Sequence, residues 1–228
     1  NKFEKRTKIC YGNGTKAEYT YDILQRLVHL KSISGSGIMQ EIDYTFDNVN
    51  NIERITNYAG VLSNGLGGTY RHDYSYDNLY RLTSSSGIWQ NNNTNLSYGL
   101  GMTYEEDGRI KTKYQNGTTL INGVQSGFSY RNVYTYNTNQ QQHTVRNVYD
   151  NQNNLNQDFE WDANGNMTLH HTQKPENLRR LCWDEENRLM AVGDNKYTSY
   201  YVYDNGGERT YKLTGPNTLM NINGNWMN

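Results

Sequence analysis

Apolar and aromatic residues alternate with polar ones over short stretches of this chain, and turn-forming residues separate the stretches. Tyr19 and Tyr21 lie at i and i+2, so a strand would place both rings on one face and Thr20 on the other. Residues 26–31 (RLVHLK) alternate in the same way. No stretch of useful length has helical periodicity. Residues 175–180 are the only place where we expect a short turn of helix. The pattern predicts an all-β chain.

The polar residues between alternating stretches predict β-hairpins. Residues 22–25 form a loop of about four residues, which is a common hairpin length. The run Ile9–Tyr11 precedes Gly12-Asn13-Gly14, a strong turn signal, and is predicted to be a strand that joins the first hairpin. Segments rich in Gly, Ser and Asn are predicted to be connecting loops. These are residues 32–37, 63–69, 84–87, 91–95 and 116–127. The polar residues 147–157 form either a solvated loop or an extension of the hairpin that begins at Tyr136.

One unit recurs along the chain: an aromatic residue, an acid, a polar turn, and then Arg-Leu at the start of the return strand. The clearest copy is Trp183-Asp184 with Arg188-Leu189, and the aromatics of successive copies lie 20 to 32 residues apart. The residues assigned to this repeat are Tyr21, Asp22, Arg26, Phe46, Asp47, Tyr76, Asp77, Arg81, Tyr104, Arg109, Trp161, Asp162, Trp183, Asp184, Arg188, Tyr203 and Asp204, with Tyr136-Asn137 as the most eroded copy. Such a period indicates an array in which each unit packs against its neighbours.

Each residue type in the unit has a physical role. The aromatic residue packs across the strands, and the acid accepts backbone N–H groups in the turn. The arginine lies close enough either to cover the aromatic ring or to pair with the acid, an interaction worth on the order of 0.5–1 kcal/mol at an exposed site. The unit is therefore predicted to be structural.

The composition is that of a folded chain with few aliphatic residues. Hydrophobic residues make up 34% of the sequence and the mean hydropathy is −0.98, but aromatic residues reach 13%, with 21 tyrosines, and the net charge is −1. Disordered chains have few aromatics and high net charge. Tyrosine rings can supply the missing apolar area. We expect a single domain over residues 1–228, an array of about eight antiparallel β-hairpins in a curved or spiralling sheet.

Charge and hydropathy exclude several partners. The 22 basic and 23 acidic residues are dispersed, which argues against nucleic acid. No apolar run approaches the roughly 18 residues that span a bilayer. The start at Asn1 without a signal-peptide pattern is expected of a processed or excised chain. Cys10 and Cys182 do not form a disulfide framework, and whether they pair is left open.

The repeat resembles the YD-repeat family, also called the Rhs (rearrangement hot spot) family. The motifs that carry the resemblance are Tyr21-Asp22 with Arg26-Leu27, Tyr76-Asp77 with Arg81-Leu82, Trp183-Asp184 with Asn187-Arg188-Leu189, and Tyr203-Asp204. The resemblance covers about residues 19–213. It implies hairpins that spiral into a hollow β-shell, which encloses a C-terminal toxin or forms the body of secreted and cell-surface bacterial proteins. It also implies that the remainder of a parent chain is the partner of this one.

The chain departs from that family in two ways. The Asp-His-Leu-Gly-Ser type of segment that usually ends the shell is not found before Asn228, and a complete shell uses several hundred residues. We therefore expect a partial shell, with neither plug nor cargo.

Candidate catalytic and metal-binding residues have simpler explanations. Glycosidases need two carboxyl groups that face each other across a bond, whereas residues 105–107 (EED) and Glu185-Glu186 fall in the turns of the repeat. His170-His171 are adjacent, so a strand would point them apart, and His29, His72 and His143 have no ligand spacing. We predict a non-enzymatic chain without cofactor or metal.

Exposed aromatic rings are the feature that favours an alternative function. Tyr and Trp faces stack on sugars, so the alternative is a carbohydrate- or cell-surface-binding module. Its candidate residues are Tyr76, Trp161, Trp183 and Tyr203. The simpler explanation, which we favour, is that these rings pack one on another between hairpins.

The ends of a hairpin array have unpaired backbone groups, which recruit partners. The expected edges are the strand around Ile9–Tyr11 and the last hairpin near Tyr201–Leu213. Either the two edges meet, which would bring Cys10 nearer Cys182, or they pair between molecules as an edge-strand dimer.

Overall fold

The computed structural model describes residues 2–138, 141–173 and 178–217, and every regular element in them is a β-strand. The strands are β1 (Lys8–Cys10), β2 (Lys16–Tyr21), β3 (Leu27–Ser34), β4 (Gly37–Phe46), β5 (Ile52–Asn57), β6 (Thr69–Tyr76), β7 (Leu82–Gln90), β8 (Thr94–Tyr104), β9 (Ile110–Ile121), β10 (Val124–Tyr136), β11 (Val145–Asp150), β12 (Leu155–Trp161), β13 (Met167–Thr172), β14 (Arg179–Trp183), β15 (Leu189–Gly193), β16 (Tyr197–Tyr203) and β17 (Arg209–Pro216). The predicted all-β class is confirmed. Of the helical turn allowed at residues 175–180, residues 175–177 lie outside the described residues, and Arg179 and Arg180 belong to β14.

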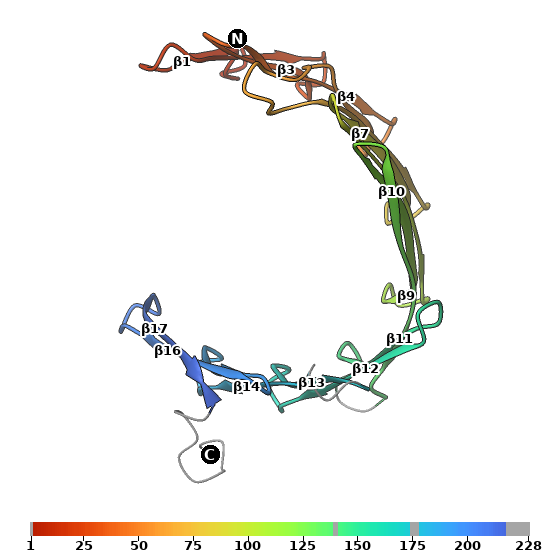
Figure 1. The fold of residues 1–228 in the computed structure, drawn as a ribbon, viewed down its shortest axis with the longest axis vertical. Helices are drawn as coiled ribbons and strands as arrows, with labels where there is room; N and C mark the ends of the chain where they lie inside the picture. Colours follow the sequence, from red (N-terminus) through yellow and green to blue (C-terminus); the bar gives the residue numbers. More distant parts are fainter. Residues whose placement is uncertain (1, 139–140, 174–177, 218–228) are drawn as a thin grey trace. The chain divides into compact units, whose positions relative to one another are not determined.

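Consecutive strands pair antiparallel, from β1 to β8 and from β10 to β17, and β9 lies between β8 and β10 (Figure 1). The chain divides into two compact units. The first unit is Asn1–Thr103 with Lys113–Tyr130, and the second unit is Tyr104–Thr112 with Arg131–Asn228. The single domain expected from the repeat stays a prediction.

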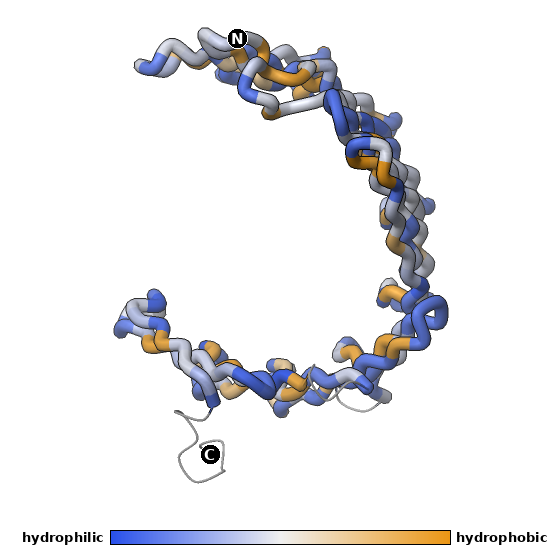
Figure 2. The backbone as a smooth tube through the Cα atoms, in the orientation of Figure 1, coloured by the Kyte–Doolittle hydropathy of each residue, from blue (hydrophilic) through white to orange (hydrophobic). Residues whose placement is uncertain are grey.

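The first unit has one apolar face. Direct strand partners project to the same face, and the register aligns Tyr19 with Leu30 and Ile42. One further row aligns Tyr44, Ile55, His72, Gly87 and Tyr98. We call the surface formed by these two rows the apolar face. Hydrophobic and hydrophilic stretches are mixed along the backbone of this unit (Figure 2).

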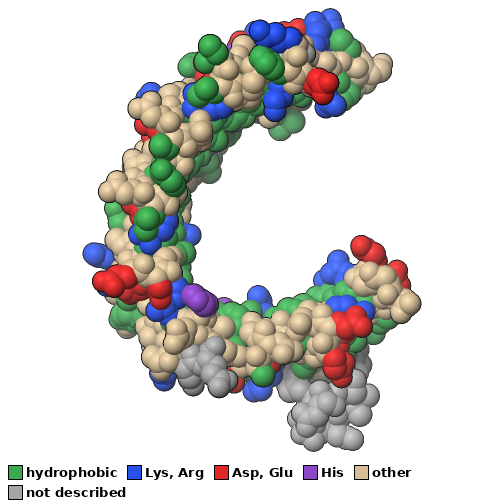
Figure 3. All heavy atoms as spheres, turned by 180° about the vertical axis from the view of Figure 1, so that it is seen from behind, with side chains coloured by type: hydrophobic (Ala, Val, Ile, Leu, Met, Phe, Trp, Pro, Cys, Tyr) green, Lys and Arg blue, Asp and Glu red, His purple; other side chains and the backbone are tan. Residues whose placement is uncertain are grey.

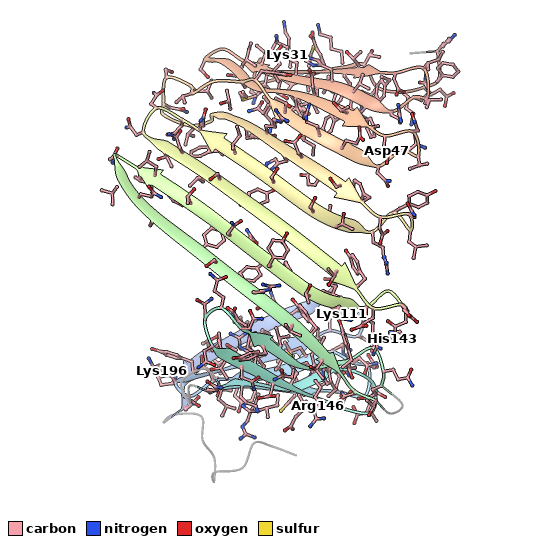
Figure 4. All side chains as sticks on the ribbon, turned by 90° about the vertical axis from the view of Figure 1, so that its right-hand side faces the viewer. Lys31, Asp47, Lys111, His143, Arg146 and Lys196 are labelled. Atoms are coloured by element: carbon pink, nitrogen blue, oxygen red, sulfur yellow. The ribbon has the colours of Figure 1, made fainter. Side chains whose placement is uncertain are left out.

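The opposite face of the first unit is charged. Lys8, Glu18, Lys31 and Glu41 are consecutive partners across β1 to β4, so their charges alternate along a row. The ammonium of Lys8 lies 2.9 Å from the carboxylate of Glu18, and that of Lys31 lies 2.8 Å from Glu41. Lys31 is labelled on the first strands in Figure 4, and Figure 3 shows Lys, Arg, Asp and Glu side chains exposed on the unit. We call this surface the charged face.

Within the described residues, no second layer covers the apolar face. All regular elements of the described residues belong to the sheet itself. Few apolar residues of the described part are buried, and most of those are small. They are Ala17, Ile42, Ala59, Val148 and Ala191. Because a folded domain normally packs two layers around a core, this sheet leaves apolar area uncovered.

The prediction of a loop is wrong for two segments. Residues 84–87 lie inside β7, and most of residues 116–127 lie inside β9 and β10. Their glycines make room for aromatic rings from the neighbouring strand. A methyl group on Gly87 would come within 2.3 Å of the Tyr98 ring, and one on Gly117 within 2.5 Å of the Phe128 ring. These glycines therefore belong to the packing of the sheet, although glycine is usually depleted in strands.

The other loop predictions agree better with the structure. Residues 63–68 and 91–93 connect strands, whereas residues 32–34 extend β3, so that connection shortens to a tight turn. The polar segment 147–157 forms the end of β11, a turn and the start of β12. Of its two interpretations, the hairpin extension is therefore the one observed.

Candidate functional site

The candidate site is the row of hairpin turns that contain the aromatic and acidic residues of the repeat. In seven turns, the N–H of the acidic position donates to the carbonyl four residues later, and the N–H of the third residue donates back to the acidic position. The seven pairs are Asp22/Arg26, Asp47/Asn51, Asp77/Arg81, Glu105/Arg109, Asp162/Asn166, Asp184/Arg188 and Asp204/Glu208. In the eroded copy, the bond joins Asn137 to Thr144 across a longer loop. The common spacing therefore reflects one backbone conformation.

The residue three positions after the acid has a left-handed backbone conformation, with positive φ. In the first unit these residues are Gln25, Asn50 and Tyr80, and in the second unit they are Gly108, Gly165, Asn187 and Gly207. Glycine and asparagine adopt positive φ most readily. Sequence reasoning missed this position, although a recurrent Gly or Asn three residues after the acid is its signal.

In the six turns that begin with aspartate, the carboxylate accepts hydrogen bonds from its own turn. At Asp77, Oδ1 accepts the N–H of Leu79 at 2.9 Å and that of Arg81 at 3.0 Å, and Oδ2 accepts Nε of Arg81 at 2.7 Å. Asp184 makes the same contacts with Glu186 and Arg188. Where Asn replaces Arg, as at Asn51 and Asn166, its amide takes over the bond to the acid. The acid thus holds the turn closed.

These bonds lower the pKa of the carboxyl groups of Asp77 and Asp184. For Asp77 and Asp184 the largest cause is the backbone hydrogen bond from Arg81 and from Arg188, respectively, and the arginine side chain lowers the pKa further. A carboxylate whose folded pKa is depressed contributes stability above its unfolded pKa of about 4, and this contribution is lost as the pH falls through the folded value.

We therefore expect the chain to lose stability on acidification below about pH 4. The check is the urea midpoint measured between pH 6 and pH 2. A double variant, Asp77→Asn with Asp184→Asn, should be less stable at pH 6 and should depend less on pH. An equal pH dependence in the variant and the parent chain would contradict this assignment.

Five aromatic residues of the repeat also bind the backbone of the hairpin before them. In the first unit, the hydroxyl of Tyr76 donates to the carbonyl of Ile52 at 2.9 Å. In the second unit the same bond joins Tyr136 to Ile110, Trp161 to Val145, Trp183 to Met167 and Tyr203 to Leu189, at 2.7 to 2.9 Å. The acceptor is in every case the residue in the leucine position of the repeat. The aromatic residue therefore links consecutive hairpins by packing and by one hydrogen bond.

The arginine of a turn covers the aromatic ring of the next turn. The Cζ atom of Arg26 lies 4.6 Å from the ring centroid of Phe46, and that of Arg109 lies 4.6 Å from Tyr136. Arg188 lies 5.5 Å from Tyr203. The sequence left two alternatives for the arginine: it could cover the aromatic ring of its own repeat, or it could pair with the acid of its own repeat. In the structure Arg26 and Arg188 each pair with the acid of their own turn and also cover an aromatic ring, but that ring belongs to the following repeat.

The residues proposed for sugar stacking are half-buried, and each of Tyr76, Trp161, Trp183 and Tyr203 donates its polar hydrogen to a backbone carbonyl. Tyr104 ends β8 at the same place in the repeat.

The residues considered for catalysis or metal binding lie in separate places. Asp107 pairs with Arg109 at 2.7 Å, and Glu186 pairs with Arg188 at 2.8 Å, so these turn acids are engaged. Within the described residues, no three His, Cys, Asp or Glu side chains gather as a metal site. Both cysteines are free thiols. None of the described segments forms a helix long and apolar enough to cross a membrane.

No protein-family model matches the chain. Two toxin subunits of Yersinia entomophaga, YenC1 and YenC2, are each 34% identical to it, over 86 and 85 residues. These matches cover 34% and 33% of this chain and 9% of each relative. A solved structure of TcdB2-TccC3-Cdc42 matches 92% of this chain with a TM-score of 0.52 and 17% sequence identity, and 12% of that chain is covered.

These findings agree with the repeat read from the sequence. The Yersinia relatives are toxin subunits, and the structural match shows a common fold. The resemblance of this chain to the YD-repeat family is thereby confirmed, with toxin subunits among its relatives.

Proposed function

We propose that this chain is a non-enzymatic wall segment of a YD-repeat shell in a secreted or cell-surface bacterial protein. The observation that carries the proposal is the uncovered apolar face of the first unit, opposite a face of paired charges. A single-layered sheet with this asymmetry suits a wall whose apolar side faces enclosed material and whose charged side faces water.

The turns support the same proposal. Their acids, arginines and aromatic rings hold each hairpin and join it to the next, so these side chains already have structural partners. The chain also spans about a tenth of the relatives that it matches. The first partner is therefore the remainder of a parent chain, and a C-terminal toxin is the proposed cargo. Association of copies through the end strands β1 and β17 stays a prediction.

The wall proposal can be tested by thiol accessibility in the full-length parent protein. Leu96 and Ser97 are adjacent exposed residues of β8 that project to the apolar face and the charged face, respectively. In a background with Cys10→Ser and Cys182→Ser, we compare Leu96→Cys with Ser97→Cys using a bulky maleimide. In the parent protein, the thiol at position 97 should react at least about tenfold faster, because a closed wall shields the other face.

The isolated 228-residue chain is the matched control, in which both thiols should react because both side chains are exposed. Equal reaction rates in the parent protein would overturn the wall proposal. The competing function, sugar binding, predicts that the isolated chain binds glycans on an array and loses that binding on substitution of Tyr76 or Trp183.

A further inference from the structure

An arginine fills the space between the first two turns of the first unit. Nη1 of Arg26 donates to the carbonyl of Asp47 at 3.3 Å and to Oδ1 of Asn50 at 2.9 Å. Its guanidinium also lies over the ring of Phe46. The arginine thereby bridges turn 22–26 and turn 47–51, and it uses the ring and the backbone of the second turn as its receptor.

The equivalent space between the second and third turns has no arginine. Asn51 occupies the arginine position, and its short side chain reaches only back to Asp47 Oδ2, at 2.8 Å. No cation of the described residues lies over the ring of Tyr76, the counterpart of Phe46. A groove of about 500 Å³ is found here instead, lined among others by Asn51, Glu53, Tyr76 and Tyr80. Asp47 marks this end of the strands in Figure 4.

The groove carries a negative charge that other turns lack. Glu53 is the extra residue of the β-bulge after Ile52, it is exposed, and no cation of the described residues pairs with it. In the other repeats, the residue that follows the leucine position has no negative charge. These residues are Val28, Thr83, Lys111, Arg146, Thr168, Met190 and Thr210. The acid therefore appears in a groove from which the arginine is missing.

Tyr80 adds a second aromatic ring to this groove. It has a φ of 61°, a conformation that is costly for a bulky residue, and the residue is 59% exposed. Among the seven turns described above, glycine or asparagine holds this position in all except those with Gln25 and Tyr80. An exposed ring held at such a cost is typical of a binding site.

We propose that this groove binds an arginine side chain from a separate peptide segment. The guanidinium would stack on Tyr76, as Arg26 does on Phe46, and would donate to the carbonyl of Asp77 and to the carboxylate of Glu53. That carbonyl accepts one N–H, from Tyr80, and has a second lone pair. Arginine is favoured over lysine because its planar group stacks and donates in several directions at once. The inference does not depend on the wall proposal.

The probe is N-acetyl-arginine amide, titrated into the isotope-labelled 228-residue chain and followed by NMR. Shifts are expected at Asn51, Glu53, Tyr76, Asp77 and Tyr80, with a dissociation constant in the millimolar range, roughly that of a single-side-chain contact. N-acetyl-lysine amide should bind at least about fivefold more weakly.

Variants make the assignment specific. Asn51→Arg fills the groove from within and should weaken binding at least about tenfold, while Glu53→Gln should weaken it about fivefold. Glu160→Gln removes an exposed carboxylate of the second unit and should leave binding unchanged. Arg26→Asn empties the first groove and should create a second, weaker site near Phe46.

The backbone spectrum of each variant verifies that it is folded. Three results would each overturn the proposal: equal affinity for the lysine probe, unchanged affinity of the Asn51→Arg variant, or shifts that avoid all residues of the groove.

Discussion

Replacing Trp183 with alanine is expected to lower the free energy of unfolding by roughly 3 kcal/mol, the lower end of the range for a large aromatic residue, because the ring is half-buried. The substitution removes the packing between two hairpins. It also removes the donor that lies 2.8 Å from the carbonyl of Met167. The measurement is a urea midpoint followed by circular dichroism.

Two controls separate the contributions at this position. Trp183→Phe keeps an aromatic ring and loses the N–H, so it should cost about 1 kcal/mol. Val202→Ala truncates a half-exposed residue of β16 and should change stability by no more than about 0.5 kcal/mol. An unchanged midpoint for Trp183→Ala would contradict the structural role of the ring and would favour sugar stacking instead.

Replacing Asp150 with alanine is expected to destabilise the second unit by about 2 to 4 kcal/mol, because three part-buried donors lose the acceptor that this buried residue supplies. Asp150 is only 4% exposed. Its Oδ1 accepts the N–H groups of Arg131 at 2.8 Å and Gln152 at 3.1 Å, and its Oδ2 accepts the side-chain amide of Asn153 at 2.6 Å. One carboxylate thus joins β10 to the turn after β11.

The matched control is Asp150→Asn, which keeps the Oδ1 acceptor and should cost less than half as much. Glu160→Ala, an exposed acid on β12, should have an effect within about 0.5 kcal/mol. The urea midpoints of the three variants at pH 7 decide the matter. If Asp150→Ala were as mild as Glu160→Ala, the hydrogen bonds of the Asp150 carboxylate would not be stabilising.

The local parts of the fold were predictable because their causes lie close together in the chain. Tyr19 and Tyr21 at i and i+2 predict a strand, and Asp22 four residues before Arg26 predicts a turn closed by a carboxylate. The repetition of this unit predicts an array of hairpins. Each of these inferences uses distances of a few residues, within which backbone geometry leaves little freedom.

Contacts between strands were predicted less well. Residues 84–87 read as a loop because Gly and Ser are typical of turns, but Gly87 lies in a strand beneath the ring of Tyr98, eleven residues later. Likewise, the polar segment around Asp150 gave no sign that this residue is buried. The strand at Gly87 and the burial of Asp150 both depend on which residues of the neighbouring strand lie opposite them.

The sequence alone was sufficient for the all-β class, the hairpin turns and the YD-repeat resemblance, because short-range spacing and residue type decide these features. The tertiary structure was needed to show that Arg26 covers the ring of the next turn, and that the space beside Asn51 and Glu53 lacks such an arginine. Those contacts join residues about twenty or more positions apart. Strand register decides which of them meet, and register is a property of the assembled sheet.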